Sequence, residues 1–106
     1  MEVTTAFVRS VDDGRIDIVV NFGLLAGREA TLAEVDRLAR RLLEEAERVT
    51  INSNRRHEVT HDEETIVHQV LVDAKAPGAV ASELRDRCEA WAVECADERR
   101  LEPLGP

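Results

Sequence analysis

The stretch VTTAFVRSVDDGRIDIVVNF, residues 3–22, contains two runs in which apolar and polar side chains alternate. Alternation with a period of two is typical of a β-strand that buries one face. Between the runs lies Asp13-Gly14, a dipeptide favoured in two-residue hairpin turns because both positions adopt positive φ angles. The stretch therefore predicts a β-hairpin, with Phe7 directly opposite Val20.

A helix start signal follows the hairpin. Thr31 and Glu34 fit the S/T-x-x-E capping box, in which each side chain satisfies an amide that the helix leaves unpaired. Apolar residues then recur with a helical period and form one stripe. The stripe consists of Leu32, Val35, Leu38, Ala39, Leu42, Ala46 and Val49. We expect a loop over residues 23–30 and a helix from Thr31 to Arg48.

The second half of the chain predicts the same order of elements. Two further strands are expected at residues 50–60 and 65–74, followed by a helix from about residue 77 to residue 100. The apolar stripe of this helix consists of Val80, Leu84, Cys88, Trp91 and Cys95. The predicted order is therefore β-β-α-β-β-α.

This order predicts an α+β fold. Two amphipathic helices must bury their apolar stripes, and a four-stranded antiparallel sheet is the surface available to them. We expect a two-layer sandwich with both helices on one face of the sheet. Residues 1–101 form a single domain, and residues 102–106 form a frayed tail with two prolines.

The composition argues against a general nucleic-acid binder. The chain of 106 residues has 14 Lys and Arg against 22 Asp and Glu, a formal net charge of −8. Affinity for nucleic acids comes largely from neutralising phosphates. The only aromatic residues are Phe7, Phe22 and Trp91, so few rings are available to stack on bases.

The sequence is typical of a cytoplasmic protein. It shows no leader pattern and no apolar run near the roughly 20 residues that span a bilayer, so we expect no membrane association. Cys88 and Cys95 lie on one predicted helix. At about 1.5 Å per residue their Cα atoms are about 10 Å apart, beyond the roughly 7 Å limit of a disulfide. Both cysteines are therefore expected to be free.

The face of the sheet away from the helices suggests an interface. If Phe7 and Val20 face the helices, several apolar side chains face the other way among polar neighbours. These are Val8, Val19, Val67 and Leu71. Exposed apolar patches tend to mark interfaces, and two-fold homodimers are the commonest oligomers. This pattern predicts a back-to-back homodimer, although valines on a strand surface can also reflect β-propensity alone.

The three histidines, His57, His61 and His68, cluster around a predicted two-residue turn at Asp62-Glu63. With that turn His57 lies directly opposite His68 on the helix side, and opposed Cβ atoms are about 4.5–5.5 Å apart. Two imidazoles at that distance can contact one ligand. The strand is also expected to pass the end of the first helix near His57, which leaves the hairpin tip as an overhanging polar arm.

Several interpretations of this hairpin remain open. The histidine pair supplies two of the three or four ligands of a zinc site, or a pH response near the usual imidazole pKa. The arm can instead bind a protein partner through Arg56, His61 and Glu63. It can also be an exposed hairpin end without a function of its own.

No catalytic motif is present. The loop from Gly23 to Arg28 lacks the Lys-Ser/Thr ending of a phosphate-binding P-loop, and no carboxylate pair is placed in an apolar pocket. We therefore assign no enzymatic activity and no cofactor. Our leading hypothesis is protein–protein association, as a homodimer or with another protein. A metal- or pH-sensing protein that uses His57 and His68 is the alternative, and an acidic inhibitor of a basic target is a third hypothesis.

Overall fold

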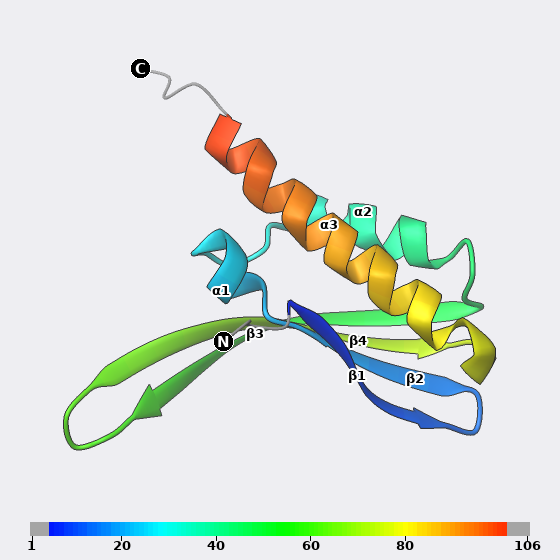
Figure 1. Cartoon of the computed structure of the whole chain (residues 1–106), viewed down its shortest axis with the longest axis horizontal. Helices are drawn as coiled ribbons and strands as arrows, with labels where there is room; N and C mark the ends of the chain where they lie inside the picture. The colour runs from blue at the N-terminus through cyan, green and yellow to red at the C-terminus, as the bar shows by residue number, and fades with distance from the viewer. Residues whose placement is uncertain (1–4, 102–106) are drawn as a thin grey trace.

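The structure, a computed structural model, describes residues 5–101, so the predicted tail at 102–106 lies outside the described residues. The elements are β1 (Ala6–Asp12), β2 (Arg15–Val20), α1 (Phe22–Ala26), α2 (Leu32–Leu42), β3 (Arg48–Val59), β4 (Glu64–Lys75), the 3-10 turn η1 (Gly78–Val80) and α3 (Ala81–Leu101). The strands form one antiparallel sheet in the order β1-β2-β4-β3. Figure 1 shows the helices together on one side of this sheet.

The predicted α+β fold with a four-stranded antiparallel sheet is confirmed, but the predicted order of elements is wrong. The segment expected to be a loop contains α1, so the order is β-β-α-α-β-β-α. This short helix forms because the Phe22 side chain is fully buried and its ring packs 5.1 Å from the Trp91 ring, centroid to centroid. Gly27 then ends α1 with φ 73° and donates its N–H to the Gly23 carbonyl.

The helix α2 starts as predicted and ends early. The Glu34 amide donates to Thr31 Oγ1 at 3.2 Å, and the Thr31 amide donates to Glu34 Oε1 at 2.9 Å, which confirms the capping box. The helix ends at Leu42 rather than near Arg48 because Arg48 already pairs with Lys75 in the sheet. Cross-strand pairing therefore overrides the apolar period that predicted a longer helix.

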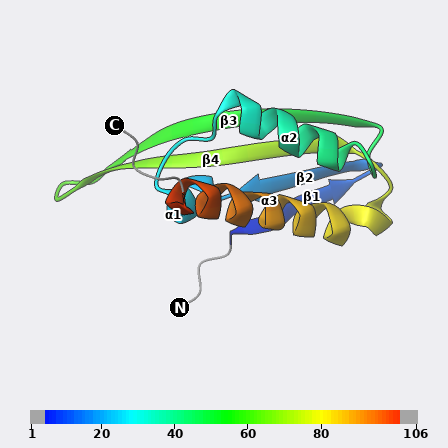
Figure 2. The ribbon, with the colours of Figure 1, turned by 90° about the horizontal axis from the view of Figure 1, so that it is seen from above.

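The core lies between the helices and the body of the sheet. Figure 2 shows α2 above β3 and α3 beside it, and α3 contacts β1 and β2. The predicted stripe on α3 is confirmed, since its middle residues are fully buried. These residues are Leu84, Cys88, Trp91 and Cys95. Trp91 donates its indole N–H to the Glu34 carbonyl at 2.8 Å, so its one polar group is satisfied inside the core.

The first hairpin has the predicted turn. Asp13 and Gly14 have φ angles of 47° and 81°, as a two-residue turn of this type requires. Beyond the turn the register shifts between Val8 and Ser10, where Arg9 forms a β-bulge. The Arg9 side chain pairs with Asp17 at 2.7 Å.

The bulge overturns the predicted facing of Phe7 and Val8. One extra residue in a strand moves every side chain on the far side of the bulge from the turn to the opposite face of the sheet. Phe7 therefore lies opposite Val19 rather than Val20, and Ala6 takes the place opposite Val20. Val8 packs against the core, so its assignment to the outer face of the sheet is wrong.

Within residues 5–101, no helix is both long enough and apolar enough to cross a membrane. The cytoplasmic location stays a prediction.

Candidate functional site

The most prominent surface feature is the outer half of the β3–β4 hairpin. Both strands have twelve residues, but β2 flanks β4 only from Val70 to Lys75. Residues 54–69, which we call the arm, therefore form a two-stranded ribbon with no third strand from the described chain beside it. Figure 1 shows the arm projecting away from the helices. The predicted overhang is present and begins earlier than expected, at Asn54 instead of near His57.

The turn at the tip of the arm differs from the predicted one. Thr60 donates its amide to the Glu63 carbonyl at 2.8 Å, and its hydroxyl accepts the amides of Asp62 and Glu63. The loop Thr60–Glu63 is centred between His61 and Asp62, one residue earlier than the predicted turn, and the threonine hydroxyl stabilises it by accepting two of its amides. Moving the centre by one residue shifts every pair of the ladder by two residues.

The predicted opposition of His57 and His68 is wrong for this reason. His57 lies opposite Ile66, and His68 lies opposite Arg55. Both imidazoles lie on the helix side of the sheet, as predicted, but they are not directly opposite each other. Among the residues that the structure describes, no three His, Cys, Asp or Glu side chains gather as a metal-binding group. Zinc binding stays a prediction, and the geometry that motivated it is absent.

The two histidines have different surroundings. His57 is exposed, and its Nε2 lies 3.9 Å from Glu64 Oε1. His68 is partly buried where α1 crosses β4, and its buried Nδ1 has no hydrogen-bond partner within residues 5–101. A Cβ added to Gly23 would lie 2.9 Å from the Cβ of His68 and 3.0 Å from its backbone N and O. Gly23 therefore seats α1 directly on the edge of β4.

The predicted contact residues of the arm are exposed. Arg56 lies on the outer face and pairs with Glu58 at 3.1 Å. His61 and Glu63 lie in the loop at the tip. Their role as protein contacts stays a prediction, and their accessibility is consistent with it.

The outer face of the sheet carries a smaller apolar patch than predicted. Phe7, Val19 and Leu71 form a row across β1, β2 and β4, and Phe7 is 39% exposed. Val19 is only 4% exposed because its neighbours cover it. Val67 also faces outward, but Gln69 separates it from Leu71 along β4. The patch is thus one short row, with Val67 isolated on the arm.

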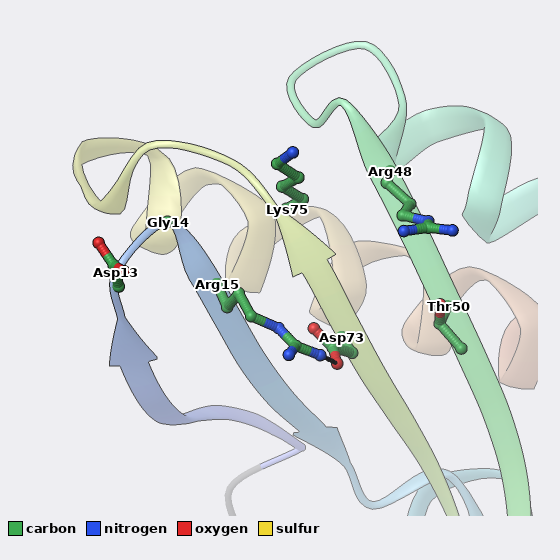
Figure 3. Close-up of a pocket in the computed structure, with 7 residues that line it drawn as sticks. All are labelled: Asp13, Gly14, Arg15, Arg48, Thr50, Asp73 and Lys75. Carbon is green, nitrogen blue, oxygen red and sulfur yellow. Dashed lines mark hydrogen bonds and ion pairs between the residues drawn. The ribbon is translucent and has the colours of Figure 1, made fainter.

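A row of cations crosses the same face at the other end of the sheet. Arg15 on β2 lies opposite Lys75 on β4, which lies opposite Arg48 on β3. These three side chains surround a shallow hollow of about 330 Å³, whose remaining lining residues are Asp13, Gly14, Thr50 and Asp73. Figure 3 shows the Arg15 guanidinium reaching toward Asp73. Like charges directly opposite each other on a sheet repel, so this row requires nearby anions.

Two of the three cations have an acidic neighbour. Arg15 pairs with Asp73, and Lys75 Nζ lies 3.7 Å from Glu47 Oε2. Arg48 makes no ion pair with any side chain in the described part of the chain. The cations come from three strands, and only the strand order and register bring them together, so no local sequence pattern predicts the row.

Two arginines of α2 pair with acidic side chains of α3. Arg37 pairs with Glu98 at 3.0 Å, and Arg41 forms two hydrogen bonds with Glu94, at 2.7 and 2.8 Å. The Arg41 hydrogen bonds lower the pKa of Glu94 and keep it ionised. These pairs join α2 to α3.

The two cysteines pack as small apolar residues. Burial raises the pKa of the Cys88 thiol to about 12 and that of Cys95 to about 11, although Arg37 Nη2 lies 3.2 Å from Cys95 Sγ. Both thiols stay protonated at neutral pH, so neither is an activated nucleophile.

Comparison with protein-family models, curated proteins and solved structures finds no match. The function is therefore inferred from the surfaces of the chain itself.

Proposed function

We propose that this protein acts by protein–protein association, as a homodimer whose main contact surface is the arm. The observation that supports this proposal is the exposure of the arm. Every β3 side chain from Asn52 to Val59 is exposed, and within residues 5–101 no helix other than α1 covers either face of the ribbon.

The physical argument is stability. An isolated two-stranded hairpin is at best marginally stable in water, because it has little apolar surface to bury. The arm exposes two apolar side chains on its helix side, Val59 at 69% and Ile66 at 50%. Contact with a second protein surface would cover these side chains and add support that the monomer lacks.

A second copy of the chain is the partner that we propose. Closed two-fold symmetry is the commonest arrangement of soluble oligomers, and it requires a surface that complements itself. The arm carries both basic and acidic side chains. These are Arg55, Arg56, Glu58, Asp62, Glu63 and Glu64. Such a mixed surface can complement its own copy.

Native mass spectrometry of the untagged protein tests the proposal, with light scattering at tens of micromolar. We expect a dimer. A variant in which residues 57–66 are replaced by Asn-Gly closes the turn on the Arg56–Val67 pair, shortens the arm and keeps the sheet body, and it should be a folded monomer. The matched control is Phe7→Glu, which alters the outer face and should remain a dimer. A monomeric wild-type protein would refute the proposal. A monomeric Phe7→Glu variant would show that the dimer interface lies on the outer face of the sheet instead of the arm.

A further inference from the structure

The free edge of β3 carries a more specific inference, which rests on the proposed homodimer. We propose that two copies join their β3 strands antiparallel, about a two-fold axis that passes between the two Ser53 residues, perpendicular to the sheet. The two sheets then form one continuous sheet, with the helices of both copies on the same side.

The two edges of the sheet differ in a way that selects β3. β1 has seven residues and a bulge at Arg9, and a short or bulged strand resists further pairing. β3 has twelve residues in continuous register with β4, and it contains no proline and no lysine. Within residues 5–101, no strand lies on its outer side. β3 is therefore the edge that is open to another strand.

The backbone determines which residues can pair. Thr60 donates its amide to the Glu63 carbonyl, and hydrogen-bonded pairs then alternate along the hairpin, at Glu58 with Thr65 and at Arg56 with Val67. The odd-numbered residues of β3 therefore direct their N–H and C=O groups toward the free edge. An axis at Ser53 pairs odd residues with odd residues, with Ile51 opposite the partner's Arg55.

The same register brings opposite charges together on the outer face. Arg48, which lacks an acidic partner in the described chain, lies opposite the partner's Glu58. Thr50 lies opposite the partner's Arg56. Even-numbered residues form the pairs without mutual hydrogen bonds, whose Cα atoms are about 4.5 Å apart and whose side chains are closest. The cation row at the hollow thereby gains a carboxylate.

Neighbouring registers are less favourable. An axis at Asn52 places Arg48 opposite the partner's Arg56, and an axis at Arg55 or Arg56 places that arginine opposite itself. Each of these arrangements opposes like charges. An axis at Asn54 leaves Arg48 opposite the partner's Thr60, beyond the end of the strand. Only the register at Ser53 gives Arg48 an acid.

This arrangement also supports the arm. The outer half of β3 in one copy runs along the inner half of β3 in the other, from Arg48 to Asn52. Each arm thereby becomes a three-stranded sheet, which is more stable in water than two strands.

Disulfide trapping tests the register. In Ser53→Cys the two cysteines form a hydrogen-bonded pair with Cα atoms about 5.5 Å apart, within the range of a disulfide. We expect a covalent dimer after mild oxidation, on a non-reducing gel. The native Cys88 and Cys95 are fully buried and do not compete. The matched control is Asn54→Cys, whose two cysteines lie diagonally at about 7–8 Å and should not cross-link. Cross-linking at Asn54 but not at Ser53 would overturn the register.

A charge exchange gives an independent readout. Glu58→Arg places two arginines opposite each other at both ends of the ladder and should weaken the dimer about tenfold or more. The double variant Arg48→Glu with Glu58→Arg should restore the dimer, with circular dichroism as the check of folding. A wild-type dimer that neither cross-links at Ser53 nor responds to the exchange would overturn this inference and leave the proposed homodimer intact. A monomeric wild-type protein would overturn both.

Discussion

The single strand β4 passes through two different environments. From Val70 to Ala74 it lies between β2 and β3, and alternate side chains are buried beneath the helices. From Glu64 to Gln69 only β3 flanks it within the described chain, and every side chain is exposed or half-buried. The cover of helices and neighbouring strands makes the difference between the two halves. We call the part of the sheet where β4 lies between β2 and β3, together with its helices, the body. The body therefore determines the stability of the fold, and we expect the arm to determine association.

The largest effect is expected from the body. Trp91 is fully buried, packs against Phe22 and donates to the Glu34 carbonyl. Trp91→Ala should lower the free energy of unfolding by about 3–5 kcal/mol, because it removes this contact area and leaves a cavity. Urea unfolding followed by circular dichroism measures the change. A loss below about 1 kcal/mol would show that the core does not depend on this ring.

The second effect is a loss of stability in acid. Hydrogen bonds from Arg28 lower the pKa of Glu34 from 4.5 to about 2, with the Thr31 cap as a smaller cause, and the Glu34 side chain is 13% exposed. Because the folded pKa lies below the unfolded value, this carboxylate stabilises the fold fully above about pH 4.5. The contribution, about 3 kcal/mol, is lost as the pH falls toward 2.

Unfolding measured between pH 6 and 2.5 tests this effect in Glu34→Gln. The difference in stability between wild type and variant should shrink as the pH falls. Glu63→Gln, which removes a charge from the arm tip, is the control. A difference that stays constant with pH would show that Glu34 is not the responsible group.

Local signals made the body predictable from the sequence. The Asp13-Gly14 turn, the capping box at Thr31 and the apolar period of α3 each depend on residues close together in the chain. These three features are present as predicted. Local chemistry also explains the two registers that were wrong, since the bulge at Arg9 and the Thr60 hydroxyl act within a few residues. Their sequence signals are weak, because arginine does not mark a bulge and threonine is common in strands.

The candidate site was less predictable because it depends on contacts between distant strands. Arg15, Arg48 and Lys75 form a row only once β4 lies between β2 and β3. No periodicity within one strand encodes that order. The free edge of β3 has the same origin, since any of the four strands could have been at the edge on sequence alone.

The third prediction concerns the junction between body and arm. Gly23→Ala would place a Cβ 2.9–3.0 Å from the Cβ and backbone of His68, and neither strand nor helix can move without disturbing the other. We expect a loss of about 1–3 kcal/mol. Gly27→Ala is the matched control, because it meets nothing within 4 Å and tests the positive φ of 73° alone. A loss below about 0.5 kcal/mol in Gly23→Ala would show that the contact with His68 does not limit the packing of α1.

The smallest effect on folding is expected in the arm itself. Val59 and Ile66 are 69% and 50% exposed, so Val59→Ser and Ile66→Ser should change the stability of the monomer by less than about 0.5 kcal/mol. Val59→Ser should also raise the dissociation constant of the dimer, because Val59 lies on the β3 strand that pairs with the partner, and Ile66→Ser on β4 should change it less. Unfolding must be measured below that dissociation constant, since association itself stabilises the folded chain. An arm variant that unfolds easily and still associates would reverse the roles of the two halves of β4.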